Sequence, residues 1–546
     1  MNDSATTQSR GARRWWLPSV SVAVWLVSLL GVVFLPQRNR WINGDSDPAL
    51  HWRIGDWMIE NRAIIRADEF SHTRFGQPLV TKEWLSEVIF AALGNSVGWP
   101  GFILLSGLLV ATTLWLLHRH LVAEDDDLLI STVLVALAAW ACLVHWWARP
   151  HLFTHLLVVV FALKLRMFDR GKMSAGHLTA WLVPLMALWV NLHGAFFAGF
   201  VLIATFWLGA AIEVGCDRWA RRGQPSGLSL PTAERLKMLT LVGALCLTAS
   251  LINPNGWKLH AQIIEFLRSE TLTGLTSEFQ SPNFHATYLL GYVALLAVIG
   301  ITVIGVRPRL RTTDMLLLGV WGCFSLQSVR NVPLFALVAT PILAESLTVW
   351  VRSAGDAKWA RWWQRTSAST KTVNDTADGA VWVALLALTV GLFVGAPRLT
   401  GGPPLLRTGI LAERFPVRAV QYLEMHPEAR PRGEVFNWYL WGGYILWVWP
   451  HRKVFVDGRN DFYGPALIEE YLSVADVKPG WEKVIEKYNV GWTLLPTEHS
   501  LNAVLALRED WRLVYRDEVA TVYRRDNGLI VGDLMPNRKA KLGRTH

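Results

Sequence analysis

Long apolar segments recur along most of this chain and alternate with short polar stretches. A helix needs roughly 17 to 25 apolar residues to cross a bilayer, and runs of this length repeat many times here. The pattern predicts about eleven such helices, near residues 17–36, 99–118, 128–147, 150–167, 177–192, 194–214, 236–253, 286–306, 313–330, 332–351 and 380–398. We therefore expect a polytopic α-helical membrane protein.

The segment between the first two predicted spans, residues 37–98, is far longer than a simple turn and should contain its own helices. Asp47 followed by Pro48 indicates an N-cap with proline at the first helical position. Apolar residues then recur at helical spacing, which predicts an amphipathic helix on the membrane. A second helix is expected from near Thr81.

Glu83 and Glu87 lie one turn apart on the polar side of that second helix. Such a pair is more typical of a solvated helix face than of a site.

The residues after the last span are predicted to form a separate domain, 400–546, joined to a transmembrane domain, 1–399, that includes the loop 37–98. Short apolar runs at 453–457, 490–495 and 512–515 predict strands, and the segments 417–426 and 466–488 predict helices. We expect a small α/β domain.

Composition supports a membrane protein. Hydrophobic residues make up 52% of the 546 residues, charged residues only 18%, and the mean hydropathy is +0.27. The net charge of +10 comes from short basic clusters between apolar segments, a pattern that indicates topology and argues against nucleic-acid binding. The four cysteines lie within or beside apolar segments, and no disulfide framework is indicated.

The basic clusters also predict an orientation. They place the N-terminus in the cytoplasm, and the loop 37–98 and the C-terminal domain on the outer face. The sequence therefore predicts a multi-pass protein of the bacterial inner (plasma) membrane with a periplasmic C-terminal domain.

Carboxylates close to hydrocarbon are costly, so acidic residues at the outer ends of spans indicate a functional site. Asp45 and Asp47 are candidate catalytic bases, although Asp47 is equally well explained as a helix cap. Arg149 and Arg330 are candidates to neutralise a leaving phosphate, and Arg330 is equally well explained as a helix-end charge. Other candidate substrate-binding residues are His51, Arg53, Glu83, His151, Asn191, His193 and Glu278.

No zinc-binding spacing, phosphate-binding glycine loop, nucleophile elbow or dinucleotide fingerprint appears in a suitable context. This disfavours NTPases and hydrolases of the soluble type. The histidines near Trp146 and Trp147 are more typical of interfacial or hydrogen-bonded structural groups than of ligands.

The run at 47–53, with the segments 68–73 and 76–78, resembles the first external loop of GT-C glycosyltransferases, especially the catalytic subunits of oligosaccharyltransferases. The resemblance implies that Asp47 is catalytic, that the donor is a polyprenyl-phosphate or polyprenyl-diphosphate sugar, and that transfer occurs on the outer face. The run at 437–444 is loosely similar to the acceptor-recognition motif of the same enzymes. An uncharacterised bacterial branch of multispanning proteins is similar at 148–153, 191–194, 253–257, 281–285, 330–333 and 457–461.

One departure concerns the metal. Oligosaccharyltransferases carry an acidic pair in the second external loop that helps bind a divalent metal, whereas the turn 145–151 here contains no acid. We assign no metal ligands and leave the cofactor open, with Arg149 and His151 as candidates to supply the cation's charge and Glu278 as a distal acid.

The leading hypothesis is an inverting glycosyltransferase that moves a sugar from a polyprenyl-phosphate donor in the bilayer to a glycan, lipid or protein acceptor. An O-antigen ligase or polymerase is disfavoured by the acidic first loop. The alternative is a non-catalytic transporter or scaffold of a polysaccharide or glycolipid export system. A transporter should carry ionisable residues near the middle of its spans, whereas the charges here gather at the ends.

Overall fold

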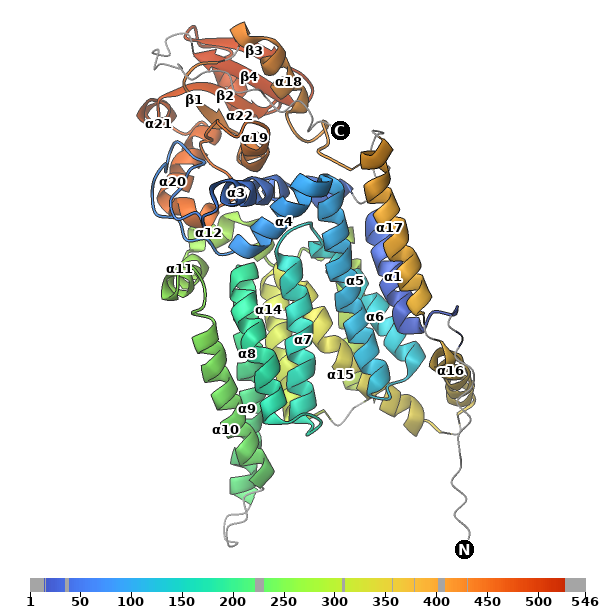
Figure 1. Ribbon diagram of the computed structural model, residues 1–546. Helices are drawn as coiled ribbons and strands as arrows, with labels where there is room; N and C mark the ends of the chain where they lie inside the picture. The colour runs from blue at the N-terminus through green and yellow to red at the C-terminus, as the bar shows by residue number, and fades with distance from the viewer. Residues whose placement is uncertain are drawn as a thin grey trace, which may run out of the picture.

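The computed structural model describes residues 14, 16–34, 39–220, 230–306, 310–355, 357–377, 379–400, 408–429 and 431–525. Each of the eleven predicted apolar segments contains a helix, and most of these helices run side by side in a bundle (Figure 1). They are α1 Val20–Phe34, α5 Trp99–Ala123, α6 Leu128–Cys142, α7 His151–Asp169, α8 Ala175–Leu192, α9 Phe197–Ala220, α10 Leu230–Ala249, α13 Leu290–Gly300, α14 Thr312–Gln327, α15 Val332–Ser353 and α17 Ala380–Thr400.

Seven helical segments among the described residues are long and apolar enough to cross a membrane, counting the short turns that extend them. They contain α5, α6, α7, α8, α9, α13 and α15. The prediction of a multi-pass α-helical membrane protein is therefore confirmed. At the end of the bundle away from the C-terminal domain, Arg166 binds Asp314 and Glu345 at 2.5 Å each, so charged groups there are paired with one another.

Two helices of the first loop, α3 Asp47–Asn61 and α4 Trp84–Val97, lie across the end of the bundle, beneath the C-terminal domain (Figure 1). Helix α3 packs against α4 and against α19 Gly442–Val448 of the C-terminal domain. Most of its residues are buried on all sides, so α3 is a packed element and not the surface-lying amphipathic helix that the sequence predicted.

The start of α3 also differs from the prediction. Asp47 is the first helical residue and Ser46 the N-cap, which makes no side-chain capping bond. The Asp45 carboxylate instead accepts the backbone N–H of Asp47 at 3.0 Å. The Asp47 side chain is thus not the cap, and its carboxylate is left for other contacts.

The C-terminal domain contains a four-stranded sheet of order β1-β2-β4-β3. The strands are β1 Glu434–Asn437, β2 Val490–Pro496, β3 Trp511–Arg516 and β4 Ala520–Arg525. The β1–β2 pair is parallel and the other pairs are antiparallel. Its helices besides α19 are α18 Val417–Met425, α20 Asn460–Ala475, α21 Trp481–Lys487 and α22 Ser500–Leu505. The small α/β unit is confirmed, but the predicted strand at 453–457 is wrong.

Residue Val454 of that segment forms only an isolated bridge with Ser71. The run is extended because it joins the first loop to the C-terminal domain: Val454 donates to the carbonyl of Phe70 at 3.0 Å and accepts from His72 at 3.1 Å. Beside this bridge, Arg459 binds the fully buried Asp68 at 2.7 Å. Because these contacts cross the predicted domain boundary, the division at residue 399 stays a prediction.

Shorter elements complete the described chain. Helices α11 and α12 lead from α10 toward the C-terminal domain, and α16 lies at the side of the bundle near its far end, in contact with α15 and α6 (Figure 1). These elements are α2 Arg40–Asn43, α11 Trp257–Arg268, α12 Glu270–Leu275, α16 Lys358–Thr376, η2 Leu143–His145, η3 Gly194–Phe196, η4 Ser277–Phe279, η5 Thr287–Leu289, η6 Ile301–Val306, η7 Val329–Asn331, η8 Pro427–Ala429 and η9 Tyr439–Trp441.

Candidate active site

A cavity of about 420 Å³ lies between the end of the helix bundle and the C-terminal domain. Its walls come from the start of α3, the segment before α4, the turn between α6 and α7, the turns η4 and η7, and two segments of the C-terminal domain, 438–440 and 458–462. The predicted site residues that line it are Asp45, Asp47, His51, Glu83, Arg149, His151, His193, Glu278 and Arg330.

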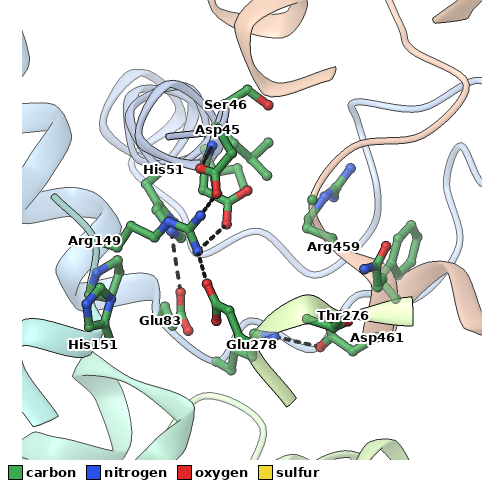
Figure 2. A pocket seen from close by; sticks show the side chains of 18 of the residues that line it. Asp45, Ser46, His51, Glu83, Arg149, His151, Thr276, Glu278, Arg459 and Asp461 are labelled. Atoms are coloured by element: carbon green, nitrogen blue, oxygen red, sulfur yellow. Dashed lines mark hydrogen bonds and ion pairs between the residues drawn. The ribbon is translucent and has the colours of Figure 1, made fainter. Parts of the chain in front are cut away.

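Arg149 binds three of the carboxylates that line this cavity. Figure 2 shows its guanidinium between the carboxylates of Asp45 and Glu278. The guanidinium lies 3.1 Å from Asp47 Oδ2 and 2.9 Å from Glu278 Oε1, and it also pairs with Asp45. Two of these carboxylates lie at the start of α3 and the third lies in η4, so one partly buried cation joins these two distant parts of the chain.

The Asp47 carboxyl is half-buried at the edge of the cavity. Burial raises the pKa of Asp47 to about 7, and the nearby carboxylates of Glu278 and Glu83 add to this effect while His51 opposes it. A carboxylate with a pKa near neutrality is suited to take a proton from a substrate.

The pKa of Glu278 shifts in the opposite direction from that of Asp47. Although burial opposes its ionisation, His145 and Arg149 hold the pKa of Glu278 well below its usual range. The Glu278 carboxylate therefore stays charged, which fits a residue that orients Arg149 better than one that exchanges a proton.

A second buried group surrounds His51, one turn after Asp47. Its Nδ1 lies 3.4 Å from Glu87 Oε1 and its Nε2 lies 3.8 Å from Glu83 Oε2, while His193 Nε2 lies 3.5 Å from Glu83 Oε1. Burial alone would lower the pKa of His51, but the two carboxylates raise it above its ordinary value. Glu83 and Glu87 are buried, and they do not form the solvated face that the sequence favoured.

The cationic side chains of the cavity differ in how many carboxylates they bind. Arg149 already binds three carboxylates, and Lys82 pairs with Asp461 of the C-terminal domain at 3.0 Å. Within the described residues Arg330 makes no ion pair, and its guanidinium lies over the ring of Phe279, 4.5 Å from the centroid. Arg330 is therefore the arginine of the cavity that is most available to an anionic ligand.

Two predicted residues, Arg53 and Asn191, are not among those that line the cavity. Arg53 is buried under the C-terminal domain and donates to the carbonyl of Pro450 at 3.4 Å. The Asn191 side chain accepts from Trp84 Nε1 at 2.6 Å and donates to the carbonyl of Ile252 at 2.7 Å. Both contacts join elements of the fold.

Sequence reasoning assigned no role to several residues that line the cavity. Lys82 stands directly before Glu83, and Asp461 belongs to a run quoted only for its similarity. Tyr439 and Arg459 also reach the cavity from the C-terminal domain. The available signal was that Lys82 is adjacent to Glu83 and that Tyr439, Arg459 and Asp461 lie in the similar runs 437–444 and 457–461. Nothing in the sequence indicated that the C-terminal segment folds back onto α3.

Gly458 is a point of direct contact between the C-terminal domain and the start of α3. A Cβ placed on Gly458 would overlap Oδ1 of Asp47, so the backbone of the C-terminal domain touches the candidate base directly. Only glycine allows this approach without moving the carboxylate.

The metal implied by the oligosaccharyltransferase resemblance does not fit these carboxylates. Asp45, Asp47 and Glu278 converge on a guanidinium that fills the space among them. Two other groups bring metal-ligating atoms within 4.8 Å of one another: His51 with Glu83 and Glu87, and His145 with His151 and His155. In the first group His51 is already placed between two acids that favour its protonated form.

No protein-family profile matches the sequence, and the search of curated proteins gave no match. Solved structures do match. The archaeal oligosaccharyltransferase AglB from Archaeoglobus fulgidus, in complex with an inhibitory peptide and a dolichol-phosphate, is 13% identical, with a TM-score of 0.51 over 87% of this chain and 69% of that chain. This chain has a GT-C fold.

Two further GT-C structures are similar. The apo oligosaccharyltransferase of Archaeoglobus fulgidus is 13% identical, with a TM-score of 0.48 over 88% of this chain and 70% of that one. ArnT from Cupriavidus metallidurans, bound to undecaprenyl phosphate, is 13% identical, with a TM-score of 0.44 over 92% of this chain and 97% of that one. At 13% identity the likeness to AglB concerns the fold.

Proposed function

We propose that this protein is an inverting membrane glycosyltransferase that moves a sugar from a polyprenyl-phosphate donor to an acceptor. The observation that carries the proposal is the convergence of Asp47, Arg149, Glu278 and Arg330 on one cavity at the end of a GT-C bundle. The cavity thus combines a carboxylate that can take a proton with cations that can hold a phosphate.

The chemistry follows from these groups. The Asp47 carboxylate takes the proton of the acceptor's nucleophilic group, whose heteroatom forms the new bond to the anomeric carbon. The bond between that carbon and the phosphate oxygen breaks on the opposite face, and the electron pair stays with the phosphate. Arg330 stabilises the charge on the departing phosphate, assisted by Lys82. Glu278 and Asp45 orient Arg149, which keeps Asp47 in place before the acceptor arrives.

A lipid-linked donor is supported by the apolar part of the cavity wall. Phe266 and Phe279 line the cavity on the side of α11 and η4. Beside Phe266, Ile264 and Leu267 of α11 are exposed, as hydrocarbon-facing residues would be. The dolichol-phosphate in the AglB complex agrees with such a carrier.

We also propose that transfer occurs on the outer face of the bacterial inner membrane, with the N-terminus cytoplasmic. The basic loops support this orientation. An alkaline phosphatase fused near residue 400 should be active, and an inactive but stable fusion would reverse the topology.

The decisive experiment is Asp47→Asn in the purified full-length protein, given a radiolabelled polyprenyl-phosphate sugar. Because the Asp47 side chain is not the helix cap, the substitution removes basicity with little effect on the start of α3. Loss of a general base predicts a rate decrease of about 10²- to 10⁴-fold. Retained turnover in a folded Asp47→Asn protein would remove Asp47 as the base. A scaffold or transporter would keep its export function when Asp47 and Arg149 are neutralised together, and an enzyme would not.

A further inference from the structure

A cluster of three histidines lies directly behind Arg149. His145 ends the turn after α6, and His151 and His155 stand one turn apart on the same face of α7. All three are at least nine-tenths buried. The rings of His145 and His151 lie 4.3 Å apart between centroids, and those of His151 and His155 5.3 Å apart.

The nitrogens of this cluster are poorly satisfied by the protein. His145 Nδ1 and His155 Nδ1 are buried and have no hydrogen-bond partner among the described residues. Buried polar atoms in folded proteins normally have a partner, because leaving one unpaired is costly. Two unpaired imidazole nitrogens in one cluster therefore indicate a ligand that the protein atoms do not include.

Two of the other ring nitrogens lie beside groups of the kind that support metal-binding histidines, although His145 Nε2 makes no hydrogen bond among the described residues. His151 Nε2 lies 2.7 Å from the carbonyl oxygen of His145, so it donates there and its Nδ1 carries a lone pair. His145 Nε2 lies 3.2 Å from Glu278 Oε2. A backbone carbonyl and a carboxylate behind the ligating imidazoles are the partners that fix the ring and its tautomer in metal centres.

We propose that His145, His151 and His155 bind a divalent transition-metal ion, with Zn²⁺ the best fit. One nitrogen from each ring lies within 4.8 Å of the others. Zinc–nitrogen bonds of about 2.0–2.1 Å in a tetrahedral site need nitrogens about 3.3 Å apart, so ring shifts of roughly 1 Å close the site. His145 and His151 also line the cavity, from which water can supply the fourth ligand.

The site differs in its ligands from the metal site that the oligosaccharyltransferase resemblance implies. That resemblance implies an acidic pair in the second external loop, whereas His145 and His151 at the ends of the corresponding turn, and His155 of α7, offer imidazoles. Arg149 lies in the turn between His145 and His151. The ion would therefore fix the turn that presents Arg149 to its three carboxylates, which is a positioning role.

The test measures metal and not sugar transfer, so its result does not depend on the proposed function. The full-length protein in detergent is incubated with excess zinc and desalted, and bound metal is quantified by plasma mass spectrometry. We expect about one Zn²⁺ per chain in the wild type, and none above background in His155→Gln. The matched control is His118→Gln, a buried histidine that bonds Ser21 and Thr132 instead, and it should retain the metal.

Size-exclusion chromatography establishes that each variant is folded. If His155→Gln does not fold, X-ray absorption at the zinc edge of the wild-type protein decides the question, because three imidazoles give a nitrogen shell with the multiple scattering of histidine rings. Absence of retained zinc in the wild type, equal retention in His155→Gln, or a shell of oxygen or sulfur ligands would each overturn the site.

Discussion

The contact between Gly458 and Asp47 makes a sharp prediction. In Gly458→Ala the new methyl group would overlap Asp47 Oδ1, and the carboxylate must move away by about 1 Å to reach an ordinary van der Waals distance. That displacement breaks the 3.1 Å contact with Arg149 and moves the base from its position at the cavity. Misplacement of about 1 Å at a reacting group costs on the order of 100-fold in rate, which corresponds to about 2.7 kcal/mol in the activation free energy.

The assay is transfer from a radiolabelled polyprenyl-phosphate sugar, with kcat and KM measured separately. We expect kcat to fall and the KM of the donor to change little, because Gly458 touches the base and not a cation of the cavity. The matched control is Gly274→Ala in α12, where a Cβ would meet nothing within 4 Å. A Gly458→Ala protein that is folded and within twofold of wild-type kcat would show that the carboxylate position does not limit the reaction.

Three other predictions test the surrounding groups. Because Asp47 acts only when ionised and its pKa is raised to about 7, kcat/KM should be lost as the pH falls through about 7, and a profile that stays flat across this range would contradict its role. Arg330→Gln should raise the KM of the donor roughly 10- to 100-fold with partial rescue in Arg330→Lys, since one charged hydrogen bond to phosphate is worth about 1.5–3 kcal/mol; an unchanged KM in a donor titration would exclude that contact. Asp68→Asn removes one of the two buried carboxylates that Arg459 binds, the other being Asp457. The lost charged hydrogen bond should cost about 1.5–3 kcal/mol in thermal or denaturant unfolding, whereas Lys371→Gln at an exposed pair should cost less than about 1 kcal/mol. Equal effects would argue against a stabilising contact between Asp68 and Arg459.

The spans could be predicted because a bilayer requires long apolar helices, and long runs of apolar residues can be recognised directly in the sequence. The exact first residue of α3 was harder to predict from the sequence. A shift of one residue in the helix boundary decides whether Asp47 caps the helix or lies inside it, and boundaries are not fixed that finely by sequence. In the structure the Asp45 carboxylate accepts the backbone N–H of Asp47, and the Asp47 carboxylate contacts Arg149.

Contacts between distant segments could not be predicted from one sequence. Glu83 and Glu87 have the spacing of a solvated face, yet His51 and the bundle cover them. The run at 453–457 has the composition of a strand, but its partner is the first loop and not the sheet. In both cases burial depends on which part of the chain packs there, and local pattern contains no information about that.

Because the floor and the roof of this cavity come from opposite ends of the polypeptide, the acidic groups around Arg149 stay uncovered during synthesis until residues 458–462 have emerged and docked. A chain that stops before residue 458 would carry the Arg149 side of the cavity without the wall that the C-terminal domain supplies.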